Sequence, residues 1–365
     1  MASDVTSQFT GTQPVAPQHA FDVDRLAAWL RGRVPGFDGA VQVEQFKGGQ
    51  SNPTFRLSAG DHRYVLRRKP PGVLLPSAHA VDREFRVSRP RAGSAVPGAQ
   101  PPERGADPPG IGSACAGMAC VDGRVLWDPT LPGMAPGDRA AIFDELNRVI
   151  AALHAVDPAA VGLADYGKAG DYVARQVARW TRQYRAAETE PIEAADRLIE
   201  WLPQHLPASD ADASRARIVH GDYRLDNVIF HPQEPRILAV LDWELSTLGD
   251  PLVDFAYHCM TWRMQGEGSR GLAGLDLAAL GIPGEAAYLR RYLDRLRDAG
   301  RGGDSVSERE WAYYLVFNMF RLVGILQGIT ARALQGNASN SRALEAGRRA
   351  RPLAEQAWRL ACEIT

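Results

Sequence analysis

Residues His220-Gly-Asp-Tyr-Arg-Leu-Asp-Asn227 and the two apolar runs that follow them decide how this chain is interpreted. The runs 228–230 and 237–241 flank His231-Pro-Gln-Glu-Pro-Arg236, whose prolines and polar residues predict a turn. The segment is therefore predicted to form a β-hairpin. Because the open ends of a hairpin are neighbours, Asn227 before the first strand should lie beside Asp242 after the second.

The polar residues at this end of the hairpin suit a metal ion and a hydroxyl substrate. A carboxylate and an amide oxygen, Asp242 and Asn227, are ligands that Mg²⁺ prefers, with water and phosphate oxygens completing the shell. The spacing His-x-Asp-x-x-x-x-Asn, followed by an Asp after a strand, is that of kinase catalytic and metal loops. Asp222 is then the predicted base, and Arg224 a fixed positive charge for a transferring phosphoryl group. For any one of these residues alone, a surface hairpin with chance polar residues is the alternative.

Composition describes a globular chain without a bias toward polyanions. Its 365 residues suffice for two domains, and 42 basic residues balance 43 acidic ones, so we expect no nucleic-acid partner. No apolar run approaches the roughly 18 residues that span a bilayer, and we expect no membrane partner. Residues 1–20 are interpreted as a disordered lead-in without a signal peptide. Four scattered cysteines imply neither a disulfide framework nor a zinc site, so a cytoplasmic location is the expectation.

The N-terminal part is predicted to contain two strands joined by a glycine-rich loop. Alternation predicts strands at 41–46 and 54–57, after a helix at 21–34, and the loop between the strands carries Gly48, Gly49, Ser51 and Asn52. Such a loop can bring backbone N–H groups to the phosphates of ATP, although a plain hairpin turn is the alternative. A third strand at 62–69 ends in Arg67, Arg68 and Lys69, and a helix at 82–87 carries Glu84. A kinase needs one such cation and one glutamate to orient it, and the choice among the three cations stays open.

Residues 89–112 interrupt this pattern. Eleven of these 24 residues are Pro or Gly, and no period of 2 or 3.6 supports an element. A kinase-like small lobe should supply two strands and the adenine-binding hinge here. We interpret the segment as irregular, and a reading frame that slipped and recovered is one hypothesis for it.

The C-terminal part is predicted to be mainly helical. Helical periodicity predicts helices at 136–156, 171–187, 191–206, 251–264, 306–335 and 339–363. Asp250 is the expected N-cap ahead of Pro251, and Asp254 is expected to brace the catalytic loop from inside. His154 is interpreted as a satisfied core or capping histidine. The expected domains are residues 21–119 as a nucleotide-binding lobe and residues 120–365 as a catalytic and substrate-binding lobe.

With these motifs in this order, the chain resembles the aminoglycoside phosphotransferase family of kinase-like enzymes. Residues 65–72, 75–80 and 241–249 resemble the branch whose animal members are fused to acyl-CoA dehydrogenases. The resemblance implies an α+β, protein-kinase-like fold of two lobes, with a small β-rich N-terminal lobe and a larger helical one. It also implies ATP and Mg²⁺ as cofactors, with the role assignments that follow. They are Asp222 as base, Asn227 and Asp242 as metal ligands, Arg67 and Glu84 as the phosphate-holding pair, and Met118 to Cys120 as the adenine contact.

The expected activity is phosphoryl transfer from ATP to an alcohol group of a small molecule. Residues 285–365 contain 13 Arg and no Lys against 9 acidic residues, which favours an anionic acceptor over a polycationic aminoglycoside. With the resemblance, this points to a hydroxyacyl-CoA or a similar hydroxy acid. The alternatives are an aminoglycoside kinase, a non-catalytic nucleotide-binding protein, and a metal-dependent phosphoesterase built on His220, Asp222 and His231.

Overall fold

The computed structural model describes most of the chain. The described residues are 11–31, 34, 37, 39–47, 53–68, 86–87, 96–98, 103–105, 115–265, 271–302, 305–335 and 343–364, of which 103–105, 115–119 and 343 are described by their backbone. They form two compact units. The first consists of Met1–Val149 and Arg224–Ser246, and the second of Ile150–Tyr223 and Thr247–Thr365. The predicted lobes are two continuous segments that meet between residues 119 and 120, whereas each of these units combines two separate segments. The predicted lobe boundary stays a prediction.

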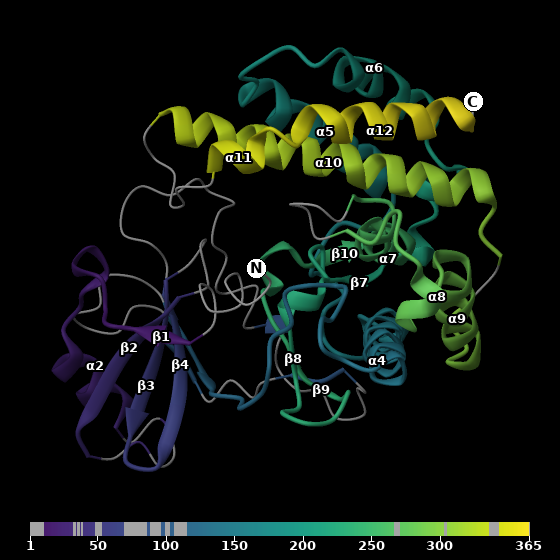
Figure 1. Ribbon diagram of the computed structural model, residues 1–365. Coiled ribbons are helices and arrows are strands. Elements are labelled where there is room, and N and C mark those ends of the chain that lie inside the picture. The colour runs from purple at the N-terminus through teal and green to yellow at the C-terminus, as the bar shows by residue number, and fades with distance from the viewer. Residues whose placement is uncertain are drawn as a thin grey trace. The chain divides into compact units, whose positions relative to one another are not determined.

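The first unit is built on a six-stranded sheet with the order β1-β2-β3-β4-β6-β5, in which every neighbouring pair is antiparallel. Figure 1 shows strands β1 to β4 side by side. The strands are β1 (Thr12–Gln13), β2 (Val41–Phe46), β3 (Thr54–Ala59), β4 (His62–Arg68), β5 (Glu103–Gly105) and β6 (Cys115–Ala119). Buried and half-buried residues alternate along β3. Phe55, Leu57 and Ala59 are buried in a hydrophobic core on one face of the sheet, and the residues between them are half-buried.

Helix α2 (Val23–Leu30) covers this core with Leu26, Ala27 and Leu30. The spacing of these residues places them on one helical face, as the periodicity predicted. Asp22 caps the helix by accepting a hydrogen bond from the N–H of Arg25. The helix is shorter than the predicted range 21–34, because its C-cap is already reached at Arg31.

The predicted hairpin is confirmed as strands β8 (Val228–Phe230) and β9 (Ile237–Val240). They pair antiparallel from Val228 with Val240, with a bulge near Phe230. The outer edge of each hairpin strand bonds to another part of the first unit. The N–H of Ile237 donates to a carboxylate oxygen of Glu145 on helix α4 (Pro136–Ala155), and Arg124 forms an isolated bridge with Phe230. The hairpin is therefore anchored at both strands.

The irregular segment 89–112 lies largely outside the described residues. Within it the structure describes residues 96–98 and strand β5, which pairs with β6 from Glu103 opposite Gly117. The N–H of Val240 donates to the carbonyl oxygen of Pro97 at 3.3 Å. Residues 103–105 thus form a strand that the sequence pattern did not predict. Of the predicted helix 82–87, Arg86 and Val87 are described, and both are helical.

The second unit is mainly helical. Helix α10 packs against α12, α5, α7 and the short helix α11, and α12 packs against α6 (Figure 1). The helices are α5 (Tyr172–Ala186), α6 (Glu193–Trp201), α7 (Pro251–Cys259), α8 (Leu277–Leu280), α9 (Glu285–Asp298), α10 (Glu308–Leu334), α11 (Ala343–Gly347) and α12 (Ala350–Glu363). Short 3₁₀ turns at 202–204 and 260–262 end the regular α-helix earlier than predicted in two places. The predicted last helix is divided into α11 and α12.

A two-stranded ribbon carries the catalytic-loop sequence within this unit. Strand β7 (Arg217–Val219) pairs antiparallel with β10 (Thr247–Gly249), with Val219 opposite Thr247. Gly167 lies against the ribbon, where an added Cβ would come within 2.7 Å of the backbone nitrogen of Leu248. The chain leaves β7 directly into His220 and leaves β10 directly into α7. One ribbon therefore positions both the loop and the helix beside it.

Helix α10 is long and apolar enough to cross a membrane by length and composition, contrary to the expectation that no run would be. Within the second unit, however, 67% of its apolar window is buried. Its buried residues occupy every position from Trp311 to Phe320. A helix that is apolar all round is what the core of a large helical unit requires.

Candidate active site

The hairpin ends bring Asn227 and Asp242 together as predicted, and both belong to the first unit. The N–H of Leu241 donates to the carbonyl oxygen of Asn227 at 2.8 Å, so the ladder extends to the residue before Asp242. Asp242 then adopts the left-handed conformation, with φ 62° and ψ 57°. A non-glycine residue there stores strain that the surrounding structure must offset, and such residues gather at functional sites.

Arg67 on β4 faces this carboxylate. Its Nη2 donates to Asp242 Oδ1 at 2.7 Å and lies 3.4 Å from Glu244 Oε2. The Arg67 side chain is 11% exposed, so the ion pair is largely shielded from water. A charge-assisted contact of this kind is stronger than an ion pair on the surface, because water and salt screen it less.

The structure distinguishes Arg67 from Arg68, two of the three cations among which the sequence left the choice open. Arg67 contacts the predicted metal ligand, whereas Arg68 Nη1 donates to the carbonyl oxygen of His19 at 3.4 Å and its guanidinium lies 5.6 Å from the ring centroid of Phe21. Lys69 lies outside the described residues. The phosphate-holding role of Arg67 stays a prediction, now with a geometry that favours it.

Several predicted nucleotide-binding residues are not described. Gly48, Gly49, Ser51, Asn52 and Glu84 lie outside the described residues. Met118 is described by its backbone alone, which pairs with Val65 across β4 and β6. Cys120 follows β6, half-buried, and its N–H donates to the carbonyl oxygen of Arg63 at 3.1 Å. Burial raises the pKa of the Cys120 thiol, so it is a weak nucleophile.

The donor set at the hairpin fits Mg²⁺. Asn227 and Asp242 supply an amide and a carboxylate oxygen from adjacent strand ends, and Mg²⁺ keeps its remaining positions for water and phosphate oxygens. Among the described residues, no three His, Cys, Asp or Glu side chains are grouped as a metal site by themselves. Asn227 is buried, while the Asp242 side chain is 32% exposed. These two residues are the ones that could hold the ion.

Helix α7 holds residues 220–222, which belong to the same unit. Asp250, Asp254 and Tyr257 are spaced i, i+4 and i+7, which places them on one helical face. Asp250 is the N-cap, and it accepts a hydrogen bond from the N–H of Leu252 at 2.8 Å, as predicted. The other two side chains face His220, Gly221 and Asp222.

Asp254 braces this loop, which confirms its predicted role. Oδ2 accepts the N–H of His220 at 2.6 Å, and Oδ1 accepts the N–H of Gly221 at 2.8 Å. His154 Nε2 also lies 3.2 Å from Oδ2, and its Nδ1 lies 2.7 Å from the hydroxyl of Tyr292. Burial alone would raise the pKa of Asp254, but the hydrogen bond and charge of His154 and the interaction with His220 hold it below its ordinary value. His154 is thus the satisfied core histidine that the sequence predicted.

Asp222 is oriented by Tyr257. The Tyr257 hydroxyl donates to Asp222 Oδ1 at 2.6 Å, and the N–H of Asp222 donates to His220 Nδ1 at 3.2 Å. Asp222 is half-buried, so its carboxylate keeps access to solvent. An ionised carboxylate that is held in place and half-buried is the kind of group that can accept a proton from a hydroxyl group.

Arg321 on α10 lies against the same loop. Its Nη2 donates to the carbonyl oxygen of Gly221 at 2.5 Å, and its guanidinium stacks over the ring of Tyr257 at 4.5 Å from the centroid.

Arg224 was predicted to face the phosphoryl group. In the first unit its guanidinium lies 3.5 Å from Asp226 Oδ2, and its catalytic role stays a prediction.

Sequence reasoning missed Glu244, Tyr257 and Arg321. Glu244 was visible two residues after Asp242, and Tyr257 was visible three residues after Asp254 on the face already assigned to the loop. Arg321 gave no signal, because it comes from a distant helix and lies among apolar residues. The histidines of the phosphoesterase alternative serve local structure instead: His220 accepts from Asp222, and His231 accepts from the turn amides of Gln233 and Glu234.

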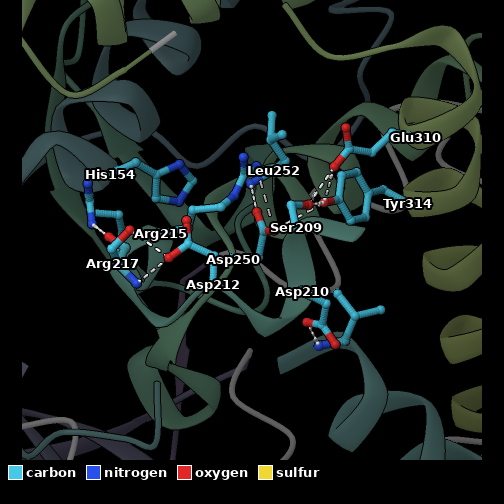
Figure 2. Close-up of polar contacts among 12 residues, drawn as sticks. His154, Ser209, Asp210, Asp212, Arg215, Arg217, Asp250, Leu252, Glu310 and Tyr314 are labelled. Atoms are coloured by element: carbon cyan, nitrogen blue, oxygen red, sulfur yellow. Dashed lines mark hydrogen bonds and ion pairs between the residues drawn. The ribbon is translucent and has the colours of Figure 1, made fainter. Parts of the chain in front are cut away.

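Asp250 ties the start of α7 to the rest of the second unit. Figure 2 shows its carboxylate between Arg215, 3.9 Å away, and the hydroxyl of Tyr314, which donates to Oδ2 at 3.1 Å. Tyr314 is also bonded to Glu310, which accepts from Ser209 at 2.7 Å. Burial raises the pKa of Asp250, although Arg215 opposes the shift. This network lies at the Arg217 end of β7, whereas the catalytic-loop sequence leaves the other end.

Known proteins with this pattern are phosphotransferases or carry a related domain. Residues 42–301 match the model of the phosphotransferase enzyme family, APH. Mouse acyl-CoA dehydrogenase family member 10 is 43% identical over 95% of this chain and 32% of its own length. Rat family member 11 is 39% identical over 99% of this chain and 45% of its own length. The chain thus spans less than half the length of these relatives.

Solved structures show the same fold. A Ralstonia eutropha protein named for the aminoglycoside phosphotransferases is 53% identical, with a TM-score of 0.83 over 94% of this chain and 99% of that one. Choline kinase from Cryptosporidium parvum reaches a TM-score of 0.58 at 14% identity, over 94% of this chain and 97% of that one. The protein-kinase-like α+β fold expected from the sequence is confirmed, and the chain belongs to the phosphotransferase enzyme family.

Proposed function

We propose that this chain transfers the γ-phosphoryl group of ATP, with Mg²⁺, to an alcohol group of a small anionic molecule, a hydroxy acid or a hydroxyacyl-CoA. The observation that carries the proposal is the fixed position of Asp222. Tyr257 orients its carboxylate, and Asp254 holds the two residues before it. A relative that is solved with a nucleotide analogue, aminoglycoside phosphotransferase APH(4)-Ia with AMP-PNP and hygromycin B, supports ATP as the donor through its shared fold.

Asp222 performs the proton transfer in this proposal. Its carboxylate accepts the proton of the acceptor hydroxyl as the oxygen attacks phosphorus, and the leaving group is ADP. Arg67 offers a guanidinium to the nucleotide phosphates, and Asn227 and Asp242 would hold the metal. Mg²⁺ neutralises phosphate charge when it is bound. Most of the rate then comes from positioning and charge stabilisation, because phosphoryl transfer asks little covalent chemistry of the protein.

The test is the variant Asp222→Asn, which keeps the shape and removes the base. ADP formation is measured with a panel of hydroxy acids, hydroxyacyl-CoAs and aminoglycosides side by side, and ATP affinity is measured separately by calorimetry. We expect turnover to fall at least about 100-fold while ATP affinity changes little. Asp298→Asn, an exposed change at the end of α9, controls for the loss of one charge.

Three outcomes separate the alternatives. Near-normal turnover by Asp222→Asn would remove Asp222 as the base. ATP binding by the unmodified protein with no product from any acceptor would favour a non-catalytic nucleotide-binding protein. Product from aminoglycosides alone would assign the acceptor to that class and exclude the anionic one.

A further inference from the structure

We propose that Arg321 and Arg179 form a subsite for an anionic group, a carboxylate or a phosphate, on the molecule that is phosphorylated. This inference rests on the proposed function, because it places the subsite next to the predicted base. The Arg321 cluster is defined by Arg179, Trp180, Tyr257 and Arg321, which all belong to the second unit. None of these residues was assigned a role from the sequence.

The first observation is a buried cation without a counter-ion. Arg321 is 6% exposed, yet no carboxylate of the described residues lies within ion-pairing distance of it. Its one hydrogen bond to the protein is to the neutral carbonyl oxygen of Gly221, and its Nε is buried without a partner among the described residues. Buried charges in proteins are normally paired, because desolvation is costly. An uncompensated guanidinium at this place is expected only where something else supplies the negative charge.

The second observation is a second arginine beside the ring of Trp180. The guanidinium carbons of Arg321 and Arg179 lie 5.2 and 5.7 Å from the ring centroid of Trp180. Arg179 is half-buried and pairs with no carboxylate in the described part of the chain. Burial lowers the pKa of Arg179, and the charge of Arg321 lowers it further. Two arginines that repel each other in a partly dry environment favour an anion between or beside them.

The third observation is an excess of hydrogen-bond donors. The indole Nε1 of Trp180 is also buried without an acceptor among the described residues. Of the acidic groups with described contacts at this loop, Asp254 is satisfied by three N–H donors and Asp222 is held by Tyr257. The cluster therefore presents donors and positive charge one residue away from the predicted base.

The geometry also explains the composition argument. Several C-terminal arginines are paired at the surface, for example Arg297 with Asp294 and Arg351 with Glu190. These pairs leave little net charge to steer a ligand. Arg321 differs from them because it is buried and faces the loop that ends in Asp222. Among the C-terminal arginines Arg321 therefore has the surroundings of a binding residue, and Arg179 on α5 is its partner in the cluster.

The test uses a binding arm that needs no turnover. Malonate, a small dicarboxylate, is titrated into the nucleotide-free protein by calorimetry, with Arg321→Gln, Arg179→Gln and the control Arg290→Gln. Arg290 is an exposed arginine of α9 without a described ion pair. We expect Arg321→Gln and Arg179→Gln each to weaken malonate binding about tenfold or more, and Arg290→Gln to leave it unchanged. Equal malonate affinity in the folded Arg179→Gln and wild-type proteins would overturn the subsite. This holds whatever affinity Arg321→Gln shows, because substitution of the buried Arg321 can also disturb folding.

The kinetic arm separates anion recognition from a structural role. Initial rates are compared for a hydroxy acid and for its primary amide of equal length. A subsite for the anion predicts that Arg179→Gln raises KM for the acid about tenfold and leaves KM for the amide unchanged. If Arg179 served local structure alone, Arg179→Gln would lower kcat for both acceptors equally, and this result would contradict the proposal. If neither acceptor is phosphorylated but malonate binding depends on both arginines, the proposed function fails and the anion subsite stands.

Discussion

Asp254→Asn is the perturbation that the structure defines most sharply. The Asp254 carboxylate accepts three hydrogen bonds, at 2.6, 2.8 and 3.2 Å, from two backbone N–H groups and from His154. An asparagine has one oxygen, so its NH₂ group must face at least one of these donors. At least one charge-assisted bond is lost, worth about 1.5 to 3 kcal/mol, and a buried donor is left unsatisfied. We therefore expect a loss of about 3 kcal/mol in the free energy of unfolding.

The assay is thermal denaturation followed by circular dichroism, with the urea midpoint as a second measure. A loss of about 3 kcal/mol in a unit of this size lowers Tm by roughly 6 to 12 °C. Asp276→Asn is the matched control, because Asp276 is an exposed N-cap that accepts from the N–H of Ala279, and asparagine caps as well as aspartate. A Tm for Asp254→Asn within about 1 °C of the wild-type value would refute the bracing role.

The pH dependence of this difference follows from the pKa of Asp254, which is held below its ordinary value despite burial. A depressed pKa means that the stabilisation is fully present above the unfolded value, about 3.9, and is lost as the pH falls through the folded value. The gap in stability between wild type and Asp254→Asn should therefore be constant from about pH 5 upward and shrink in more acidic solution. A gap that widens on acidification would contradict the assignment.

Three further predictions concern single contacts. Tyr257→Phe removes the 2.6 Å hydrogen bond that orients Asp222, so kcat of the folded protein should fall about tenfold in steady-state assays, whereas an unchanged kcat would contradict the orienting role. Arg67→Lys keeps the charge but loses the planar guanidinium, and KM for ATP should rise about tenfold in steady-state assays, while an unchanged KM would remove Arg67 as the phosphate-holding cation. Gly123→Ala should lower the urea midpoint by the equivalent of about 1 to 3 kcal/mol, because the added Cβ would lie 2.3 Å from the backbone oxygen of Phe230, and an unchanged midpoint would show that this close approach relaxes freely.

The local patterns of the sequence predicted the elements well. The hairpin at 228–240 followed from two short apolar runs around a proline-rich turn, and its register then placed Asn227 next to the strand end before Asp242. The N-cap at Asp250 and the bracing role of Asp254 were also predicted, from the Asp-Pro start of the helix and the motif around it. In these cases the period of the backbone alone determines which residues are neighbours.

Long-range partners could not be predicted in the same way. A period of 2 does not tell whether Arg67 or Arg68 meets an acidic group, because that depends on which residues the hairpin brings to the strand. Arg321 is surrounded in sequence by apolar residues, and its position against Gly221 comes from the packing of α10 on α7. The strand at 103–105 formed without a sequence pattern, since pairing with β6 supplied what local propensity did not.

The interleaving of the two units has a consequence for how the protein is made. The first unit needs both Met1–Val149 and the hairpin stretch Arg224–Ser246, which leave the ribosome at different times. At bacterial or eukaryotic elongation rates, the interval between residues 149 and 246 lasts about 5 to 20 s. During this interval the Glu145 carboxylate and the Pro97 carbonyl oxygen lack the N–H groups of β9 that bond to them, so the first unit is completed after much of the second has been synthesised. Truncations that end before residue 246 should for the same reason accumulate as incompletely folded chains.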